Sequence, residues 1–283
     1  MKITCTPKNN YFSYNSKQNM SFKAGLTAKM LAELKQVNTL EISDKLIKQG
    51  IPSDFRNNKI IAWSCDKTIE IFQQLNKKFG QKLSLPKGFY VEDFTKLNVE
   101  NQRALSTCNL RPTELIKNSS EPVPSRTIFF NTLHNWDNID SISDINYANR
   151  CFSTDSFLYV FLHEFSHVVH EDRLLNKLGG KKLSKELEKL NNEEQLQAYR
   201  RKYGARVEQI CNYAMNTPLD AIACDLPRVI APCLEAETLS PTKNPFIGTP
   251  YEKLHFWQRT QKNLDNNDSL NEILRNFWNG KFD

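Results

Sequence analysis

The chain has 283 residues, of which 39% are hydrophobic and 25% are charged, a composition that excludes a globally disordered protein and suffices for a sizeable core. Its formal net charge is +6, from 38 Lys and Arg against 32 Asp and Glu. This basic excess is small and forms no stripe of cations interleaved with aromatic residues, so it does not predict a nucleic-acid-binding protein.

The seven cysteines are widely spaced, odd in number and without a C-x-x-C pair, which argues against a disulfide scaffold or a zinc finger and favours a reducing compartment. The longest notable apolar run, residues 157–162, is far too short to span a bilayer. The N-terminal residues contain no apolar core of a secretion signal. We therefore expect no membrane span, and either a cytoplasmic location or export without a classical signal peptide.

Residues 1–25 are rich in Asn, Ser and Lys without periodicity, which is typical of a flexible tail. Residues 26–58 are expected to form an N-terminal helical segment, in which residues 26–49 have the period of a helix and a loop follows. Residues 59–80 carry apolar side chains at steps of three or four, so they predict an amphipathic helix that Gly80 ends.

Two later segments predict strands. Residues 82–94 nearly alternate between apolar and polar side chains, with a turn at Pro86 and Gly88. Residues 126–131 predict a second strand, which we expect at the edge of the sheet just before the next helix. At such an edge, the strand could pair with an extended peptide.

The strongest helical pattern covers residues 153–180, with Ser153 or Thr154 as the N-cap and with Gly179 and Gly180 at the end. The apolar side chains of this segment share one broad face, at about 100° per residue. The opposite side carries three histidines and two glutamates, which we expect to point away from the core face: His163, Glu164, His167, His170 and Glu171.

The last third of the chain is mostly helical in pattern. Residues 184–214 are charged and helical, and residues 216–232 predict another helix with Thr217 as its N-cap. Pro227 is expected to kink or end that helix. Residues 238–283 are expected to contain a loop and a short amphipathic C-terminal helix.

Residues 163–167, His-Glu-Phe-Ser-His, have the spacing H-E-x-x-H on the strongest helix. Side chains at i and i+4 are neighbours one turn apart, so both imidazoles can bind one ion. Zinc bonds imidazole nitrogen at about 2.0–2.1 Å, which such a pair can satisfy. Glu164, beside the first histidine, is placed to take a proton from a metal-bound water. The alternative is a helix that is merely rich in histidine.

A catalytic zinc site needs a third protein ligand and an open position for water. His170 is the nearest candidate, since it shares the side of the helix that carries His163. Three side chains in a row along one straight helix cannot easily surround one ion, however. A histidine that is solvated, or that supports a ligand from behind, is the better interpretation of His170.

The motif resembles zincin metalloproteases of the gluzincin type, in which an acid from a second helix, some tens of residues downstream, completes the site. It is similar in particular to the catalytic domain of the anthrax lethal factor group, which has a HEFxH helix and a tyrosine seven residues before the third-ligand acid. Here Tyr213 precedes Asp220 by seven residues, and small residues follow: Ala221, Ala223 and Cys224. The resemblance implies Asp220 as the third zinc ligand and Tyr213 as a hydrogen-bond donor to the developing oxyanion.

The sequence departs from that family at the third ligand, where the family has glutamate. Aspartate is one methylene shorter, so the two helices must lie nearer to each other. Asp220 also follows the Thr217 N-cap by three residues, where an acid often completes a capping arrangement. Asp225 and Glu208 are the reserve ligands, and a packed aromatic is the alternative interpretation of Tyr213.

These observations predict an α+β protein, mostly helical with a small mixed sheet, whose zincin-like catalytic domain covers residues 59–237. The expected function is that of a zinc-dependent metallopeptidase, which hydrolyses a protein or peptide substrate through a metal-activated water. Zn²⁺ would be held by His163, His167 and Asp220, with Glu164 and Tyr213 as catalytic residues. The alternative is a catalytically inactive zincin-like binding protein.

Overall fold

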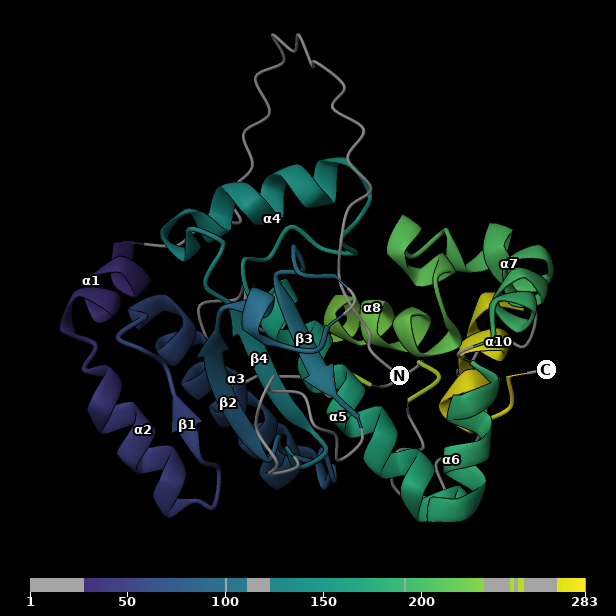
Figure 1. Ribbon diagram of the computed structural model, residues 1–283, viewed down its shortest axis with the longest axis horizontal. Helices are drawn as coiled ribbons and strands as arrows, with labels where there is room; N and C mark the ends of the chain where they lie inside the picture. The colour runs from purple at the N-terminus through teal and green to yellow at the C-terminus, as the bar shows by residue number, and fades with distance from the viewer. Residues whose placement is uncertain are drawn as a thin grey trace, which may run out of the picture.

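The computed structural model describes residues 28–99, 101–110, 123–190, 192–231, 245–246, 249–251 and 269–282. The predicted flexible tail, residues 1–25, and most of the predicted C-terminal loop lie outside these residues. The fold class is α+β, with helices around a small mixed sheet of four strands, as the sequence predicts (Figure 1).

The sheet has the strand order β1-β2-β4-β3. Three strands are parallel: β1 (Ser53–Asp54), β2 (Gly88–Glu92) and β4 (Thr127–Asn131). The fourth strand, β3 (Ser106–Asn109), pairs with β4 in the antiparallel sense. Strands β2 and β4 fall within the two segments predicted as strands. The other two were not predicted, because β1 has only two residues and all four side chains of β3 are buried, which leaves no alternation to detect.

The prediction that residues 126–131 form the edge of the sheet is wrong, because β4 lies between β2 and β3. Every residue of β4 is buried, as expected for a strand with neighbours on both edges and packing on both faces. The neighbouring strand β3 takes the position at the end of the sheet. A periodic pattern predicts a strand but not its place in the sheet, since that place depends on partners far along the chain.

The helices of the described residues form the greater part of the fold. The α-helices are α1 (Ala28–Gln36), α2 (Thr39–Lys48), α3 (Lys59–Phe79), α4 (Ile139–Ala148), α5 (Tyr159–Leu178), α6 (Gly180–Lys189), α7 (Glu193–Val207), α8 (Pro218–Ile230) and α10 (Ser269–Trp278). Short 3-10 turns are η1 (Phe94–Lys96), η2 (Trp136–Asn138) and η3 (Asn212–Met215). No helix in this part of the chain is long and apolar enough to cross a membrane.

Several predicted helix ends are confirmed. Helix α3 ends at Gly80, which has the left-handed conformation with φ of 64° that glycine adopts at little cost. Helix α8 begins after Thr217, whose side chain accepts the backbone N–H of Asp220, and Pro218 is its first residue. The predicted C-terminal helix is α10.

The structure refines or corrects three other helix predictions. The described part of the helical pattern in residues 26–49 forms two helices, α1 and α2, because Asn38 interrupts it and caps the start of α2 with its side chain. Helix α5 begins at Tyr159 rather than near Ser153, whose hydroxyl donates to the carbonyl of Cys224 and does not cap α5. Helix α8 contains Pro227 and continues to Ile230, so of the two predicted effects of this proline, a kink or an end, the end is contradicted.

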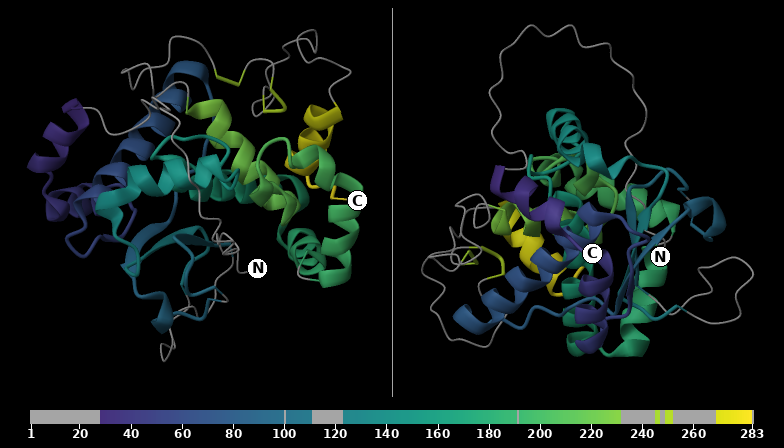
Figure 2. Two further views of the ribbon diagram at one scale, coloured as in Figure 1. Left: turned by 90° about the horizontal axis from the view of Figure 1, so that it is seen from above. Right: turned by 90° about the vertical axis from the view of Figure 1, so that its left-hand side faces the viewer.

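Helix α5 lies at the centre of the molecule, between the sheet on one side and α8 on the other (Figures 1 and 2). On the sheet side, Phe165 stacks on Phe89 of β2 at 5.5 Å between ring centroids and contacts Phe72 of α3 edge-on at 5.1 Å. The histidines lie opposite the apolar face in the helix-wheel pattern, yet they are buried, because α8 covers His163 and His167 and α10 covers His170. His163 is 1% exposed and His167 is 2% exposed. A polar helix face can be buried when its groups have partners on a second helix.

Candidate metal centre

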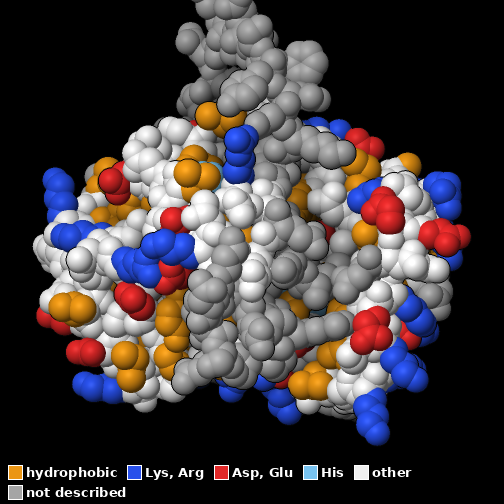
Figure 3. Space-filling model, viewed as in Figure 1, with side chains coloured by type: hydrophobic (Ala, Val, Ile, Leu, Met, Phe, Trp, Pro, Cys, Tyr) orange, Lys and Arg blue, Asp and Glu red, His pale blue; other side chains and the backbone are white. Residues whose placement is uncertain are grey.

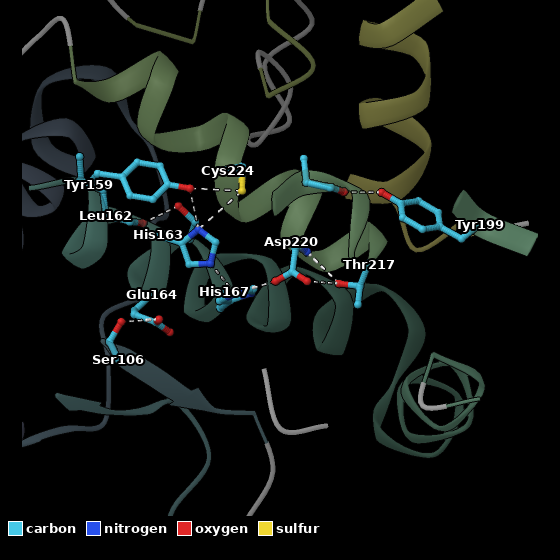
Figure 4. A network of polar contacts seen from close by, with 12 residues as sticks. Ser106, Tyr159, Leu162, His163, Glu164, His167, Tyr199, Thr217, Asp220 and Cys224 are labelled. Carbon is cyan, nitrogen blue, oxygen red and sulfur yellow. Dashed lines mark hydrogen bonds and ion pairs between the residues drawn. The ribbon is translucent and has the colours of Figure 1, made fainter. Parts of the chain in front are cut away.

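Two helices bring three ligand side chains together. His163 and His167 lie one turn apart on α5, and Asp220 comes from the first turn of α8, which packs against α5 (Figure 4). The two Nε2 atoms of the histidines are 3.2 Å apart, and Oδ1 of Asp220 is 3.7 Å from Nε2 of His167. One ligand atom from each residue lies within 4.8 Å of the others.

The close approach of the helices follows from the small residues of α8. Ala221, Ala223 and Cys224 are completely buried, so little side-chain volume separates the α8 backbone from α5. This approach compensates for the shorter reach of aspartate at position 220. The small residues in the sequence had predicted this close approach of the two helices.

The three side chains fit a divalent metal ion. Burial lowers the pKa of His163 to about 3 and that of His167 well below its usual range, so both rings are neutral, the form that binds metals. Two nitrogens bound to one tetrahedral zinc lie about 3.3 Å apart, close to the observed separation of the two Nε2 atoms. Oδ1 of Asp220 is buried and has no hydrogen-bond partner, as expected of an atom that serves as a ligand.

Asp220 takes part both in the N-terminal cap of α8 and in the candidate metal site, the two roles that the sequence left open. Its Oδ2 accepts a hydrogen bond of 2.9 Å from the hydroxyl of Thr217, and its backbone N–H donates to the same hydroxyl at 3.0 Å. Oδ1 is therefore the oxygen that can bind a metal ion together with the two histidines. Burial raises the pKa of Asp220 to about 7, and its bond from Thr217 opposes that rise, so a nearby cation would stabilise the ionised form.

Glu164 points from α5 towards the sheet, where β3 holds it. The hydroxyl of Ser106 donates to its Oε1 at 2.7 Å. Oε2 is buried without a hydrogen-bond partner. Burial, the largest cause, and the nearby charge of Asp220 raise the pKa of Glu164 to about 8. Ser106 was not predicted, because its strand has no periodic pattern and lies 58 residues before Glu164.

The other side of the His163 ring faces a polar group of residues. Tyr159 places its hydroxyl 3.3 Å from Nδ1 and donates it to Sγ of Cys224 at 3.2 Å (Figure 4). Sγ of Cys224 lies 3.9 Å from the same Nδ1. Tyr213 in η3 contacts the same ring edge-on, with 5.6 Å between ring centroids. Tyr159 was not predicted, although its place four residues before His163 on one helix is the signal that would have found it.

The remaining sequence candidates lie outside this cluster. His170 contacts the C-terminal helix, with Nε2 3.0 Å from the carbonyl of Phe277 and its ring stacked on Trp278. Asp225 pairs with Arg228 and accepts the hydroxyl of Tyr251 at 2.9 Å. A third candidate, Glu208, lies at the surface, and its nearest cation is the guanidinium of Arg150 at 3.8 Å.

His170 gives the folded protein a predictable sensitivity to acid. Burial lowers its pKa from 6.5 to about 4, so the ring is neutral in the folded protein but takes up a proton below pH 6.5 when the chain unfolds. Above pH 6.5 the ring is neutral in both the folded and the unfolded chain, so the free energy of unfolding does not depend on its protonation. Between pH 6.5 and 4 only the unfolded chain takes up the proton, which lowers the free energy of unfolding by about 1.4 kcal/mol for each pH unit of acidification. We expect His170→Gln, which keeps a donor but does not titrate, to flatten this slope. Urea unfolding followed by circular dichroism at several pH values measures this slope. Parallel curves of unfolding free energy against pH for the wild type and the variant would contradict the prediction.

Comparisons with known proteins assign no family to the chain. No protein-family model matches it, no curated protein matches it, and no solved structure matches it. A functional proposal therefore rests on the chemistry of the residues that α5, α8, η3 and β3 bring together.

Proposed function

We propose that this protein is a zincin-like, zinc-dependent metallopeptidase, which hydrolyses peptide bonds of a protein or peptide substrate through a metal-activated water. The observation that carries the proposal is the convergence of His163, His167 and Asp220, whose ligand atoms lie within 4.8 Å of one another. Glu164, on the same helix, adds a buried carboxylate oxygen without a partner. Two neutral imidazoles, one carboxylate and an adjacent glutamate are the groups that a hydrolytic zinc site needs.

A zinc ion bound there would supply a Lewis acid for the scissile carbonyl and lower the pKa of water. The positive charge of that ion would lower the pKa of Glu164, so its carboxylate would accept the proton of the attacking water and deliver it to the leaving amine. Because Ser106 holds Oε1, Oε2 is the oxygen that carries this proton. Tyr213, against the face of His163, donates its hydroxyl to the oxygen that becomes negative during attack.

The substrate does not pair with β4, since both edges of β4 are occupied by neighbouring strands. On the face shown in Figure 3, acidic and basic side chains are interspersed among the described residues and form no broad patch of one sign.

The test is to measure metal content and hydrolysis together. After expression in zinc-replete medium, we expect the purified protein to hold about one zinc per chain by mass spectrometry and to cleave members of a peptide library. A chelator should abolish cleavage, and added zinc should restore it. Zinc without cleavage of any peptide would favour the inactive binding protein, and a protein that binds no zinc would overturn both.

A further inference from the structure

Tyr159 lies on α5 one turn before the candidate ligand His163, on the same face of the helix. Phe152 stacks on its ring, with 4.1 Å between the ring centroids and an angle of 24° between the planes. Tyr159 is 1% exposed, and its neighbour Cys224 on α8 is completely buried. The ring of Tyr159 is therefore packed in one orientation, and its hydroxyl is held between the two helices.

This hydroxyl contacts His163 on its own helix and Cys224 on α8 (Figure 4). It lies 3.3 Å from Nδ1 of His163 and donates to Sγ of Cys224 at 3.2 Å. A hydroxyl has a single hydrogen but can also accept, and a thiol is the weaker donor of the two groups. The hydrogen that Tyr159 gives to Cys224 cannot also bind Nδ1. The oxygen of Tyr159 is then placed to accept a hydrogen from Nδ1.

The other nitrogen of the imidazole points to the candidate metal centre. Nε2 of His163 lies 3.2 Å from Nε2 of His167. A neutral imidazole carries one hydrogen, so a hydrogen on Nδ1 leaves the lone pair of Nε2 for a metal ion. Histidine ligands generally donate from their second nitrogen to an acceptor in the protein, which fixes both the tautomer and the orientation of the ring.

We propose that Tyr159 and Cys224 are positioning residues of the metal centre. A hydrogen-bond chain runs from Nδ1 of His163 through the Tyr159 hydroxyl to the Cys224 thiol, and it fixes the tautomer that binds a metal at Nε2. Sγ of Cys224 lies on the Nδ1 side of the ring, 3.9 Å from that nitrogen, so its role is to accept from Tyr159. The purpose of the hydrogen-bond chain rests on the proposed function, whereas the tautomer exists without a metal.

Tyr159→Phe keeps the ring that stacks on Phe152 and removes only the hydroxyl. The hydrogen on Nδ1 then loses this acceptor, so the affinity for Co²⁺, a spectroscopic substitute for zinc, should fall by about 10- to 100-fold. The matched control is Tyr251→Phe, which removes another buried hydroxyl, one that donates to Asp225 of α8 at 2.9 Å. Its Co²⁺ affinity should stay at the wild-type value. Equal affinities of wild type and Tyr159→Phe would overturn the proposal, and so would an equal loss in both variants.

Cys224→Ala keeps the Tyr159 hydroxyl but removes the atom to which it donates. The hydroxyl then donates to Nδ1 of His163 instead, which moves the hydrogen of the ring to Nε2, where it opposes metal binding. The Co²⁺ affinity should again fall by about 10- to 100-fold. Cys224→Ser restores an acceptor at this position and should return the affinity to within a few-fold of wild type. Equal losses in Cys224→Ala and Cys224→Ser would overturn the role of Cys224 as an acceptor.

A second measurement needs no metal. Long-range ¹H–¹⁵N spectra of the imidazole rings distinguish the two neutral tautomers, and the protein has only five histidines to assign. We expect the hydrogen of His163 on Nδ1 in wild type and Cys224→Ser, on Nε2 in Cys224→Ala, and a mixture of both tautomers in Tyr159→Phe. A wild type with the hydrogen on Nε2 would overturn the proposal. The expected tautomers in proteins that bind no Co²⁺ would support the hydrogen-bond chain and contradict the metallopeptidase alone.

Discussion

Glu164→Gln should leave zinc bound and lower kcat/KM by about 100- to 10,000-fold, the usual contribution of a general base. Glutamine has nearly the shape of glutamate and can still accept the hydroxyl of Ser106, so the packing between α5 and β3 is kept. It cannot take a proton from water at neutral pH. The variant therefore separates proton transfer from metal binding, and the measurement is zinc content by mass spectrometry beside steady-state peptide hydrolysis.

The matched control is Glu194→Gln, the same change at an exposed position on α7. This control should retain both zinc and wild-type kcat/KM. Activity of Glu164→Gln within a few-fold of wild type would remove Glu164 from the mechanism. Loss of zinc together with activity would assign Glu164 to metal binding instead.

Replacing Asp220 with Ala should weaken zinc binding by more than about 100-fold, because even residues that only support metal ligands contribute 10- to 100-fold. Hydrolysis should be lost at zinc concentrations that saturate the wild type. Asp220 also belongs to the cap of α8, so the variant removes the bond between its carboxylate and Thr217 as well. Isothermal titration with zinc in the presence of a competing chelator measures the change in affinity.

Thr217→Ala separates the two roles of Asp220. It removes the N-cap and should lower the unfolding free energy by about 1 kcal/mol, while Oδ1 of Asp220 still serves as a ligand. Zinc affinity should then fall far less than in Asp220→Ala. Unchanged zinc affinity in Asp220→Ala would move the third ligand to another acid, with Asp225 and Glu208 as the sequence alternatives.

Much of the local structure could be predicted, because its determinants are near neighbours in the chain. Gly80 ends α3 and Thr217 begins α8 through bonds that span a single turn. The i, i+4 spacing of His163 and His167 likewise fixes their relative position as soon as the segment is helical. The nearness of Asp220 was suggested by a family resemblance and by the small residues beside it, and the structure brings it within 3.7 Å of His167.

What could not be predicted depends on partners distant in sequence. The helix-wheel pattern placed the histidines away from the core face, but it could not show that α8 buries that side. Strand β4 became internal only because β3 pairs with it, and β3 has no pattern of its own.

The contact between His170 and the C-terminal helix constrains when this protein can finish folding during synthesis. The imidazole of His170 and the carbonyl of Phe277 that it contacts are 107 residues apart. While the ribosome is still producing those residues, α5 has emerged with part of its buried surface uncovered. We expect the nascent chain to expose that surface until helix α10 leaves the exit tunnel, which makes this interval the one in which chaperones would bind.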